Sequence, residues 1–334
     1  MRNIIAIILI AFATWKIYSN SFPPDVKPEP KPPVVKPEPV VDITIEDAIE
    51  NIKLDNVKKY VYDLSSKEFD GRGTGTEGNE KAFQYISSYL KSLNIPFKEQ
   101  SFEARGRKTK NIIAYIVPKK VKNNKLIVIG AHFDHLGSSG NGYYPGADDN
   151  ASGVAGVMAV ASALNSYKDK LNHVILLQFY SAEEMGLLGS KYYTNYPMFP
   201  EQSPDINSHA VMINLDMIGY LKRTYSIDEI TTRYREDNSY LEFPYSESKV
   251  DLRYIVNDLS SKYSFANNIC GYRPGGSDHA PFYNKGIPVV FLHTGLHSNY
   301  HKQSDTPDKL NYEGIVVVSK FAFEILIKVD SLDL

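Results

Sequence analysis

The sequence predicts an α/β fold, with helices covering both faces of a central sheet. Apolar, β-rich runs alternate along the chain with segments of helical periodicity, which is the pattern of such folds. The 334 residues, 43% of them hydrophobic, are enough for a large core, and a single α/β unit of this length is common. Histidine and aspartate residues also gather after one apolar run, at the position where ligands collect in open α/β sheets.

Residues 1–20 are predicted to be a signal peptide or a signal anchor, and residues 21–42 a proline-rich linker. Arg2 precedes an apolar run, Ile4–Trp15, which is shorter than the ~20 residues of a comfortable transmembrane helix and is typical of a secretion signal. The cleavage pattern at Ser19–Ser21 is poor, so an uncleaved anchor stays open as an alternative. Proline at the density found after Phe22 excludes helix and favours an extended spacer. We therefore expect an extracytoplasmic protein that is secreted, periplasmic or anchored to a membrane.

Charge and cysteine content exclude several classes of protein. A net charge of −2 gives no electrostatic argument for nucleic acid as a partner. The single cysteine, Cys270, excludes an internal disulfide framework and a cysteine-rich zinc site.

The globular unit is predicted from residue 43 to residue 334. A helix begins after Thr44, with Asp47 as an imperfect capping-box partner, and helical spacing continues to Val61. The glycine-rich loop Phe69–Thr76 lacks the lysine of a phosphate-binding loop. Residues 221–251 have no clear period and are predicted to be an insertion. The other predicted elements are helix Asn79–Leu93, strands Asn111–Val117 and Lys125–Ile129, helix Gly153–Leu164, strand Val174–Tyr180, helix Gly186–Asn195, strand Ala210–Leu215, helix Tyr254–Asn267, strand Ile287–Leu292 and helix Tyr312–Asp330.

Residues that could bind metal follow several of these predicted strands. Zinc prefers neutral imidazole and carboxylate ligands. A site for two zinc ions and a base needs fewer residues than the sequence offers: two histidines, two aspartates and a glutamate as ligands, and a second glutamate as the base. The candidates are His132, Asp134, His135, Asp148, Asp149, Glu183, Glu184, Asp216 and His301.

The positions of the first candidates in the sequence indicate different roles for them. Asp134 lies two residues after His132, so in an extended chain it points to the same side and can accept the imidazole N–H. Asp148 and Asp149 precede a predicted helix. Capping of that helix can account for Asp149 while Asp148 still binds metal.

The later candidates also follow apolar segments. Glu183 and Glu184 are neighbours, which point to opposite sides of an extended chain, so one can coordinate while the other faces a water molecule. Asp216 follows an apolar strand, where a carboxylate is seldom buried without a partner. His301 lies in a polar loop and would by itself be read as a surface histidine.

These pieces together resemble the co-catalytic di-zinc aminopeptidases of the bacterial leucyl aminopeptidase and aminopeptidase Y type. They occur in the order of that family and cover most of residues 45–330. The matching segments are G-A-H-F-D-H (130–135), P-G-A-D-D-N-A-S-G (145–153), S-A-E-E-M-G-L-L-G-S (181–190), N-L-D-M-I-G (214–219), G-G-S-D-H-A-P-F (275–282) and Y-H-K-Q-S-D-T-P-D-K (300–309). The resemblance implies a three-layer αβα fold, zinc exopeptidase-like, with a mixed, mostly parallel sheet.

The resemblance also implies a set of metal ligands for two Zn²⁺ ions per chain. Asp148 would bridge the two ions, and the peptide bond that follows the bridging acid is cis in some relatives. His132 and Asp216 would complete one site, and the remaining two ligands the other. The implied ligands are His132, Asp148, Glu184, Asp216 and His301.

Three further residues receive roles in catalysis from the same resemblance. Glu183 would be the general base that takes a proton from a water shared by the two zincs. Tyr300 would help to stabilise the oxyanion, and Asp134 would orient His132. The implied activity is removal of N-terminal residues from peptides with a free N-terminus.

Other functions remain open on the sequence alone. A glutaminyl cyclase resembles this fold but uses one zinc, and the paired Asp148 and Asp149 argue against it. A carboxypeptidase or deacylase would need a positive anchor for a substrate carboxylate, which Arg253 or Arg273 could supply. A non-catalytic binding module is the third alternative, and such proteins tend to lose ligands or the base. The number of zinc ions per chain would separate the first alternative from the aminopeptidase.

Overall fold

The computed structural model describes residues 42–199, 205–221, 240–242, 252–263, 269–270 and 276–334. The chain divides into two units, Met1–Asp42 and Ile43–Leu334. The predicted signal segment and most of the predicted linker and insertion lie outside the described residues. Among the helices of the described part, none has the length and apolar character to cross a bilayer.

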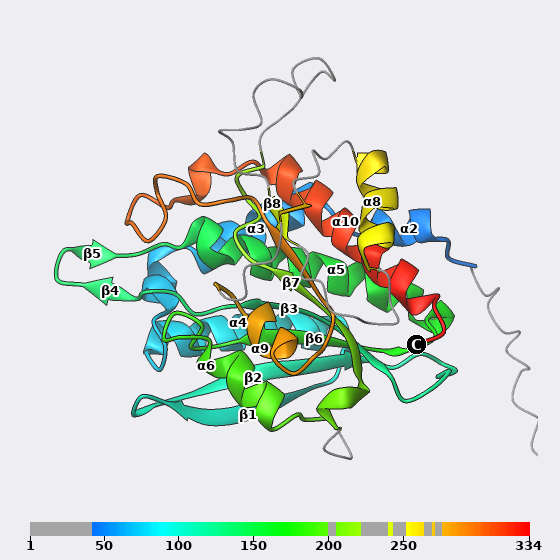
Figure 1. Cartoon of the computed structure of the whole chain (residues 1–334). Coiled ribbons are helices and arrows are strands. Elements are labelled where there is room, and N and C mark those ends of the chain that lie inside the picture. The colour runs from blue at the N-terminus through cyan, green and yellow to red at the C-terminus, as the bar shows by residue number, and fades with distance from the viewer. Residues whose placement is uncertain (1–41, 200–204, 222–239, 243–251, 264–268, 271–275) are drawn as a thin grey trace, which may run out of the picture. The chain divides into compact units, whose positions relative to one another are not determined.

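The described strands form a mixed sheet at the centre of the second unit (Figure 1). Four neighbouring strands, β6, β3, β7 and β10, run parallel, whereas β1 and β2 are antiparallel to each other and β2 to β6. On the other side β8 runs antiparallel to β10, and β9 pairs with β8. The spatial order is β1 (Phe97–Ala104), β2 (Arg107–Ile116), β6 (Val174–Tyr180), β3 (Leu126–His132), β7 (His209–Leu215), β10 (Val289–His293), β8 (Tyr240–Glu242) and β9 (Ile269–Cys270).

The helices lie on both faces of this sheet, so the predicted αβα fold is confirmed (Figure 1). Helices α3, α4, α5 and α10 contribute to one apolar cluster, and α6 and α9 to the other. The α-helices are α2 (Ile45–Ile49), α3 (Leu54–Leu64), α4 (Glu77–Ser92), α5 (Gly153–Tyr167), α6 (Leu188–Asn195), α8 (Leu252–Tyr263), α9 (His279–Tyr283) and α10 (Tyr312–Asp330). Short helical turns cover Lys67–Arg72, Ala147–Ser152, Lys168–Lys170, Ile206–Ser208 and Pro307–Lys309, and a small hairpin pairs β4 (Ser138–Ser139) with β5 (Gly142–Tyr143).

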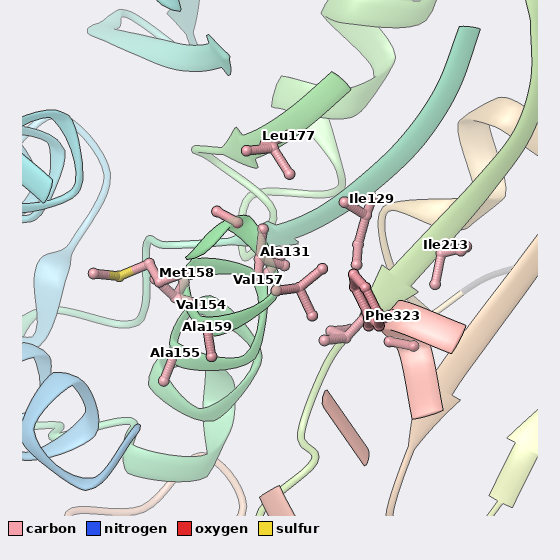
Figure 2. Packing of buried hydrophobic residues seen from close by; sticks show 14 of the residues in the cluster. Ile129, Ala131, Val154, Ala155, Val157, Met158, Ala159, Leu177, Ile213 and Phe323 are labelled. Carbon is pink, nitrogen blue, oxygen red and sulfur yellow. The ribbon is translucent and has the colours of Figure 1, made fainter. Parts of the chain in front are cut away.

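The alternation of side chains along β3 explains why this strand is buried at every position and apolar as far as Ala131. Ile127 and Ile129 belong to the cluster that α5 and α10 cover, whereas Leu126 and Val128 belong to the opposite cluster. Successive residues of a strand point to opposite faces, so a strand covered on both sides needs apolar residues at every position. Figure 2 shows the first cluster, with Ile129 close to Phe323 of α10. This packing fixes the strand ends that carry the candidate site.

Two differences from the predicted elements have physical reasons. The first predicted helix is two helices, because α2 ends after one turn and α3 begins at Leu54, although the capping box between Thr44 and Asp47 is formed. Strand β1 was not predicted, because it is an edge strand with alternating exposed polar residues such as Lys98 and Glu103. A polar, half-exposed strand gives a weak apolar signal.

A buried histidine at the start of β7 should make stability depend on pH. His209 Nδ1 donates to the Ile206 carbonyl (2.9 Å), and Nε2 accepts from the Tyr193 hydroxyl (2.7 Å). Burial lowers the pKa of His209 from 6.5 to about 4. At pH values above the pKa of the unfolded chain, the His209 imidazole is neutral in both the folded and the unfolded chain. Below it the unfolded chain takes up the proton first, so the free energy of unfolding falls as pH drops from about 6.5 toward 4.

Replacing His209 by glutamine should flatten this dependence. Between pH 7 and pH 5 the loss of unfolding free energy should be smaller by about 2 kcal/mol in His209→Gln than in the wild type. Denaturant unfolding of metal-free protein at the two pH values measures it. Equal losses in both proteins would show that His209 is not the titrating group.

Candidate metal centre

The candidate residues meet at the carboxyl ends of the parallel strands. His132 is the last residue of β3, Asp216 follows β7, and the loop that carries His301 follows β10. Glu183 and Glu184 come three and four residues after the end of β6. Because parallel strands end at one edge of a sheet, residues far apart in sequence converge there.

The chain turns sharply where three of these residues are presented. Ala182, Met217 and His301 have positive φ angles of 62°, 52° and 55°. Non-glycine residues seldom adopt this left-handed conformation. Glu183 therefore begins a turn, with its carbonyl accepting from the Gly186 amide (2.8 Å), rather than continuing the strand. The two glutamates separate as predicted, but through a turn and not through strand alternation.

The first group of possible ligands contains His132, Glu183 and Asp216. One ligand atom from each lies within 4.8 Å of the others. His132 Nε2 is 3.4 Å from Asp216 Oδ1 and 3.4 Å from Asp149 Oδ1. His132 and Asp216 are buried, at 1% and 6% exposed, whereas Glu183 is partly exposed.

The second group contains His135, Asp149 and Glu184, again with ligand atoms within 4.8 Å of one another. His301 joins it from the loop after β10, since its Nε2 lies 3.1 Å from both Asp149 Oδ2 and Glu184 Oε2. The His301 side chain is 36% exposed, so this group faces the outside of the molecule. The Tyr300 ring stacks on the His301 ring with centroids 3.8 Å apart.

Asp149, and not Asp148, lies between the two groups. Its Oδ1 faces His132 and its Oδ2 faces His301. The prediction that Asp148 is the bridging acid is therefore wrong by one residue. The cis peptide bond expected after the bridging acid is likewise one residue later and joins Asp149 to Asn150.

The side chain of Asp148 instead satisfies buried polar groups. Its Oδ1 accepts from the Gly219 amide (2.6 Å) and the Ser152 hydroxyl (2.9 Å), and its Oδ2 faces His297 Nε2 (3.1 Å). These partners hold the start of α5 against the segment after β7. Asp148, and not Asp149, therefore has a structural role, and it acts through these partners rather than as a cap of the helix.

Asp134 lies beside His132 as expected, but mainly through its backbone. His132 Nδ1 donates to the Asp134 carbonyl (3.1 Å), and the carboxylate Oδ1 is 3.7 Å away. The carboxylate accepts from the Thr74 hydroxyl (2.8 Å) and from the Glu183 amide (3.0 Å). A proton on Nδ1 leaves Nε2 free as a ligand atom. Asp134 therefore positions both His132 and the backbone of Glu183.

His135 was noted in the sequence but received no role. It is fully buried, its Nδ1 lies 2.8 Å from Glu184 Oε1, and its Nε2 has no hydrogen-bond partner among the described residues. Its ring packs on Gly146, where an added Cβ would approach ring atoms to 2.5 Å. Its position three residues after His132, at the same strand end, was the signal that could have identified it.

The charges of the centre are strongly coupled. Burial raises the pKa of the Glu183 carboxyl well above its usual range. Burial would also raise the pKa of Asp149, but His135 and other histidines outweigh it and hold that pKa well below its usual range. Hydrogen bonds to Asp149 and Glu184 raise the pKa of His301 to about 10. Asp149 and His301 thus each favour the charged form of the other.

The donors fit divalent cations, zinc in particular. Imidazole and carboxylate oxygens are the zinc ligands that remain when cysteine is absent. Asp216 Oδ1 is buried and has no hydrogen-bond partner in the described part of the chain. Leaving such an atom unsatisfied costs about 1–3 kcal/mol or more for a charged group. A cation at the first group would satisfy it.

Comparisons with known proteins agree with this fold. The solved LapA aminopeptidase of Legionella pneumophila superposes with a TM-score of 0.67 at 23% identity, covering 89% of this chain and 78% of that one. The glutaminyl cyclase of Porphyromonas gingivalis superposes with a TM-score of 0.66 at 20% identity, over 84% of this chain and 99% of that one. At these identities the likeness concerns the fold, and both activities share it.

Similarity in sequence is found to bacterial and fungal proteins. Uncharacterized protein YfbL of Escherichia coli (strain K12) is 28% identical over 263 residues, which are 71% of this chain and 76% of that protein. Leucine aminopeptidase 2 of Trichophyton rubrum is 27% identical over 226 residues, which are 62% of this chain but only 42% of that protein. The chain thus spans less than half the length of this fungal relative.

The αβα fold is shared with solved aminopeptidases, and in this chain two groups of histidine and carboxylate side chains lie at its strand ends. The family model of peptidase family M28 matches residues 111–326. The chain belongs to peptidase family M28, and the predicted relationship to the zinc aminopeptidases is confirmed at that level.

Proposed function

We propose that this protein is an aminopeptidase that uses two zinc ions per chain to remove N-terminal residues from peptides. The observation that carries the proposal is the pair of ligand groups joined by one carboxylate, Asp149. His132 and Asp216 would hold one ion, and Glu184 and His301 the other. A bridging carboxylate between two such groups suits a two-metal hydrolase, because two ions can share a substrate and a nucleophile.

The residues of the chain have separable tasks in this reaction. Zinc ions bound here would supply a water nucleophile at neutral pH and polarise the scissile carbonyl. Glu183 lies within reach of the first group and would take the proton of that water, then give it to the leaving amine. The Tyr300 hydroxyl, on the ring that stacks on His301, would donate to the oxyanion.

Charge supports action on a free N-terminus. Four carboxylates, on Asp149, Glu183, Glu184 and Asp216, converge at the centre. Asp149, Glu184 and Asp216 would be occupied as zinc ligands, so Glu183 is the carboxylate left to attract a substrate ammonium group, a charge that an acylated N-terminus lacks.

The first test measures activity, metal content and the need for a free amine together. The full chain should hydrolyse leucine-, alanine- or lysine-p-nitroanilide, lose this activity in chelator, and regain it with zinc. The matched N-acetylated substrates should react at least about 10²-fold more slowly, a difference of about 3 kcal/mol in transition-state binding. Equal hydrolysis of acetylated and free substrates would contradict the aminopeptidase assignment.

The glutaminyl cyclase is the second candidate, because the Porphyromonas gingivalis enzyme shares the fold. The two candidates differ in metal content. Elemental analysis should give close to two zinc ions per chain for the aminopeptidase. A content close to one, together with cyclisation of an N-terminal glutaminyl peptide, would favour the cyclase.

A further inference from the structure

Asp305 is a fully buried carboxylate that binds the backbone of the segment carrying Asp149. Its Oδ1 and Oδ2 each lie 3.1 Å from the Asp148 amide, and Oδ2 also lies 3.1 Å from the Asp149 amide. Its own carbonyl accepts from the Ala147 amide (3.2 Å). Asp305 is 0% exposed. It contacts no candidate ligand atom in these bonds, so it acts on backbone alone.

Asp305 also belongs to the loop that presents His301. It follows His301 by four residues, and its amide donates to the Lys302 carbonyl (3.0 Å). His301 Nε2 and Asp149 Oδ2 are 3.1 Å apart. The loop that carries His301 and the segment that carries Asp149 therefore meet at two places. One is the contact between His301 and Asp149, and the other is the set of hydrogen bonds to the Asp305 carboxylate.

The buried side chain of Arg72 binds the carbonyl groups of the residues just before Asp148. Arg72, 1% exposed, donates to the carbonyls of Pro145 (2.8 Å) and Gly146 (2.8 Å), and also to that of Phe133 (3.0 Å). Burial lowers its pKa to about 10, so it remains charged at neutral pH. The segment before Asp149 thus has its carbonyls bound by a guanidinium and its amides bound by a carboxylate. Charge-assisted hydrogen bonds of this kind are stronger than neutral ones.

We propose that Asp305 is a positioning residue of the metal centre, which sets the place of the Asp149 carboxylate relative to His301. The inference rests on the proposed metal centre. Ligand orientation of this kind typically changes metal affinity or activity by about 10–100-fold when the supporting group is replaced.

A matched control exists at the opposite end of the sheet. Asp330, 3% exposed, also binds two consecutive amides, those of Asn172 (2.9 Å) and His173 (2.8 Å). These amides precede the start of β6, whereas the metal centre lies beyond the ends of the strands. Asp330 also faces the side chains of Asn172 (Nδ2, 3.2 Å) and His173 (Nδ1, 3.2 Å). Asp305→Asn and Asp330→Asn therefore make the same chemical change at buried carboxylates that bind consecutive amides, and only one of the two carboxylates touches a ligand segment.

The experiment titrates cobalt(II) into metal-free full chain and follows its absorption spectrum, then measures kcat and KM of the zinc-loaded proteins. Asp305→Asn should bind cobalt about 10–100-fold more weakly, with an altered spectrum. Its kcat should fall by about 10-fold or more while KM changes by less than about 3-fold. Asp330→Asn should lower the melting temperature but keep cobalt affinity, spectrum and kcat close to wild type.

Unchanged cobalt affinity and kcat in Asp305→Asn, with the same loss of melting temperature as Asp330→Asn, would overturn the positioning role. If Asp305→Asn does not fold, Asp305→Ser, which leaves room for a water molecule, decides by the same measurements. A wild type that binds cobalt but cleaves no peptide would refute the proposed activity, and the affinities would still decide the role of Asp305. A wild type that binds no divalent cation would overturn both proposals.

Discussion

Glu183→Gln is expected to keep two zinc ions per chain and to hydrolyse leucine-p-nitroanilide about 10²–10⁴-fold more slowly than wild type. Glutamine keeps the size of the side chain but cannot take a proton. Glu183 lies in the first group with His132 and Asp216, within reach of the ligand atoms that would hold a zinc ion. The loss should appear in kcat, because proton transfer belongs to the chemical step.

The neighbouring glutamate provides the control for this prediction. Glu184 contacts His301 (3.1 Å) and His135 (2.8 Å) in the second group, so Glu184→Gln should lose zinc as well as rate. Zinc content measured by elemental analysis separates the two variants. Near-normal turnover of Glu183→Gln would reject the assigned base, and loss of zinc from it would make Glu183 a ligand instead.

The fold and most site segments could be predicted because they follow from local patterns. Strands β3 and β6 are apolar at nearly every position, with His132 at the end of β3 and Gln178 in β6 as the polar exceptions, and that pattern requires cover on both faces. Parallel strands covered in this way end at one edge, so His132, Glu184 and Asp216 had to meet whatever the details of the loops. The sequence therefore located the site without any knowledge of distances.

The choice between Asp148 and Asp149 could not be predicted in the same way. Residues 147–152 are neither strand nor regular α-helix, and Asp149 and Asn150 have non-helical backbone angles inside this turn. The side-chain periods of a strand (two residues) and of a helix (3.6 residues) therefore do not apply here, and neither indicates which side chain points inward. The decision depends on a partner 71 residues away, the Gly219 amide, which takes the carboxylate of Asp148.

The roles of residues that act through the backbone could not be predicted, although Asp305 lies in one of the segments that match the family. Arg72 lies in a glycine-rich loop and Asp305 in a polar loop, and both would be read as solvent-exposed charges. Both are buried, because each satisfies several backbone groups that loops around the site leave unpaired. Such roles can be recognised only when the three-dimensional positions of the backbone groups are known.

Asp149→Asn and Asp148→Asn should separate the bridging acid from its neighbour. We expect Asp149→Asn to hold fewer than two zinc ions and to lose at least about 10³-fold in kcat/KM, equivalent to about 4 kcal/mol. Asp149 has one oxygen 3.4 Å from His132 and the other 3.1 Å from His301. A neutral amide in its place offers one weak oxygen to two cations and removes a charge that both require.

Asp148→Asn should retain both zinc ions and most of its activity, and should lose stability instead. Its oxygen can still accept from the Gly219 amide, but its new NH₂ group faces His297 Nε2, which lies 3.1 Å from the present carboxylate. Two facing donors cost about 1–3 kcal/mol of unfolding free energy. Zinc content, kcat/KM and denaturant unfolding of the two variants measure these effects side by side. If Asp148→Asn lost zinc and Asp149→Asn kept it, the bridging role would return to Asp148, and the carboxylate that joins the two ligand groups would have to move when metal binds.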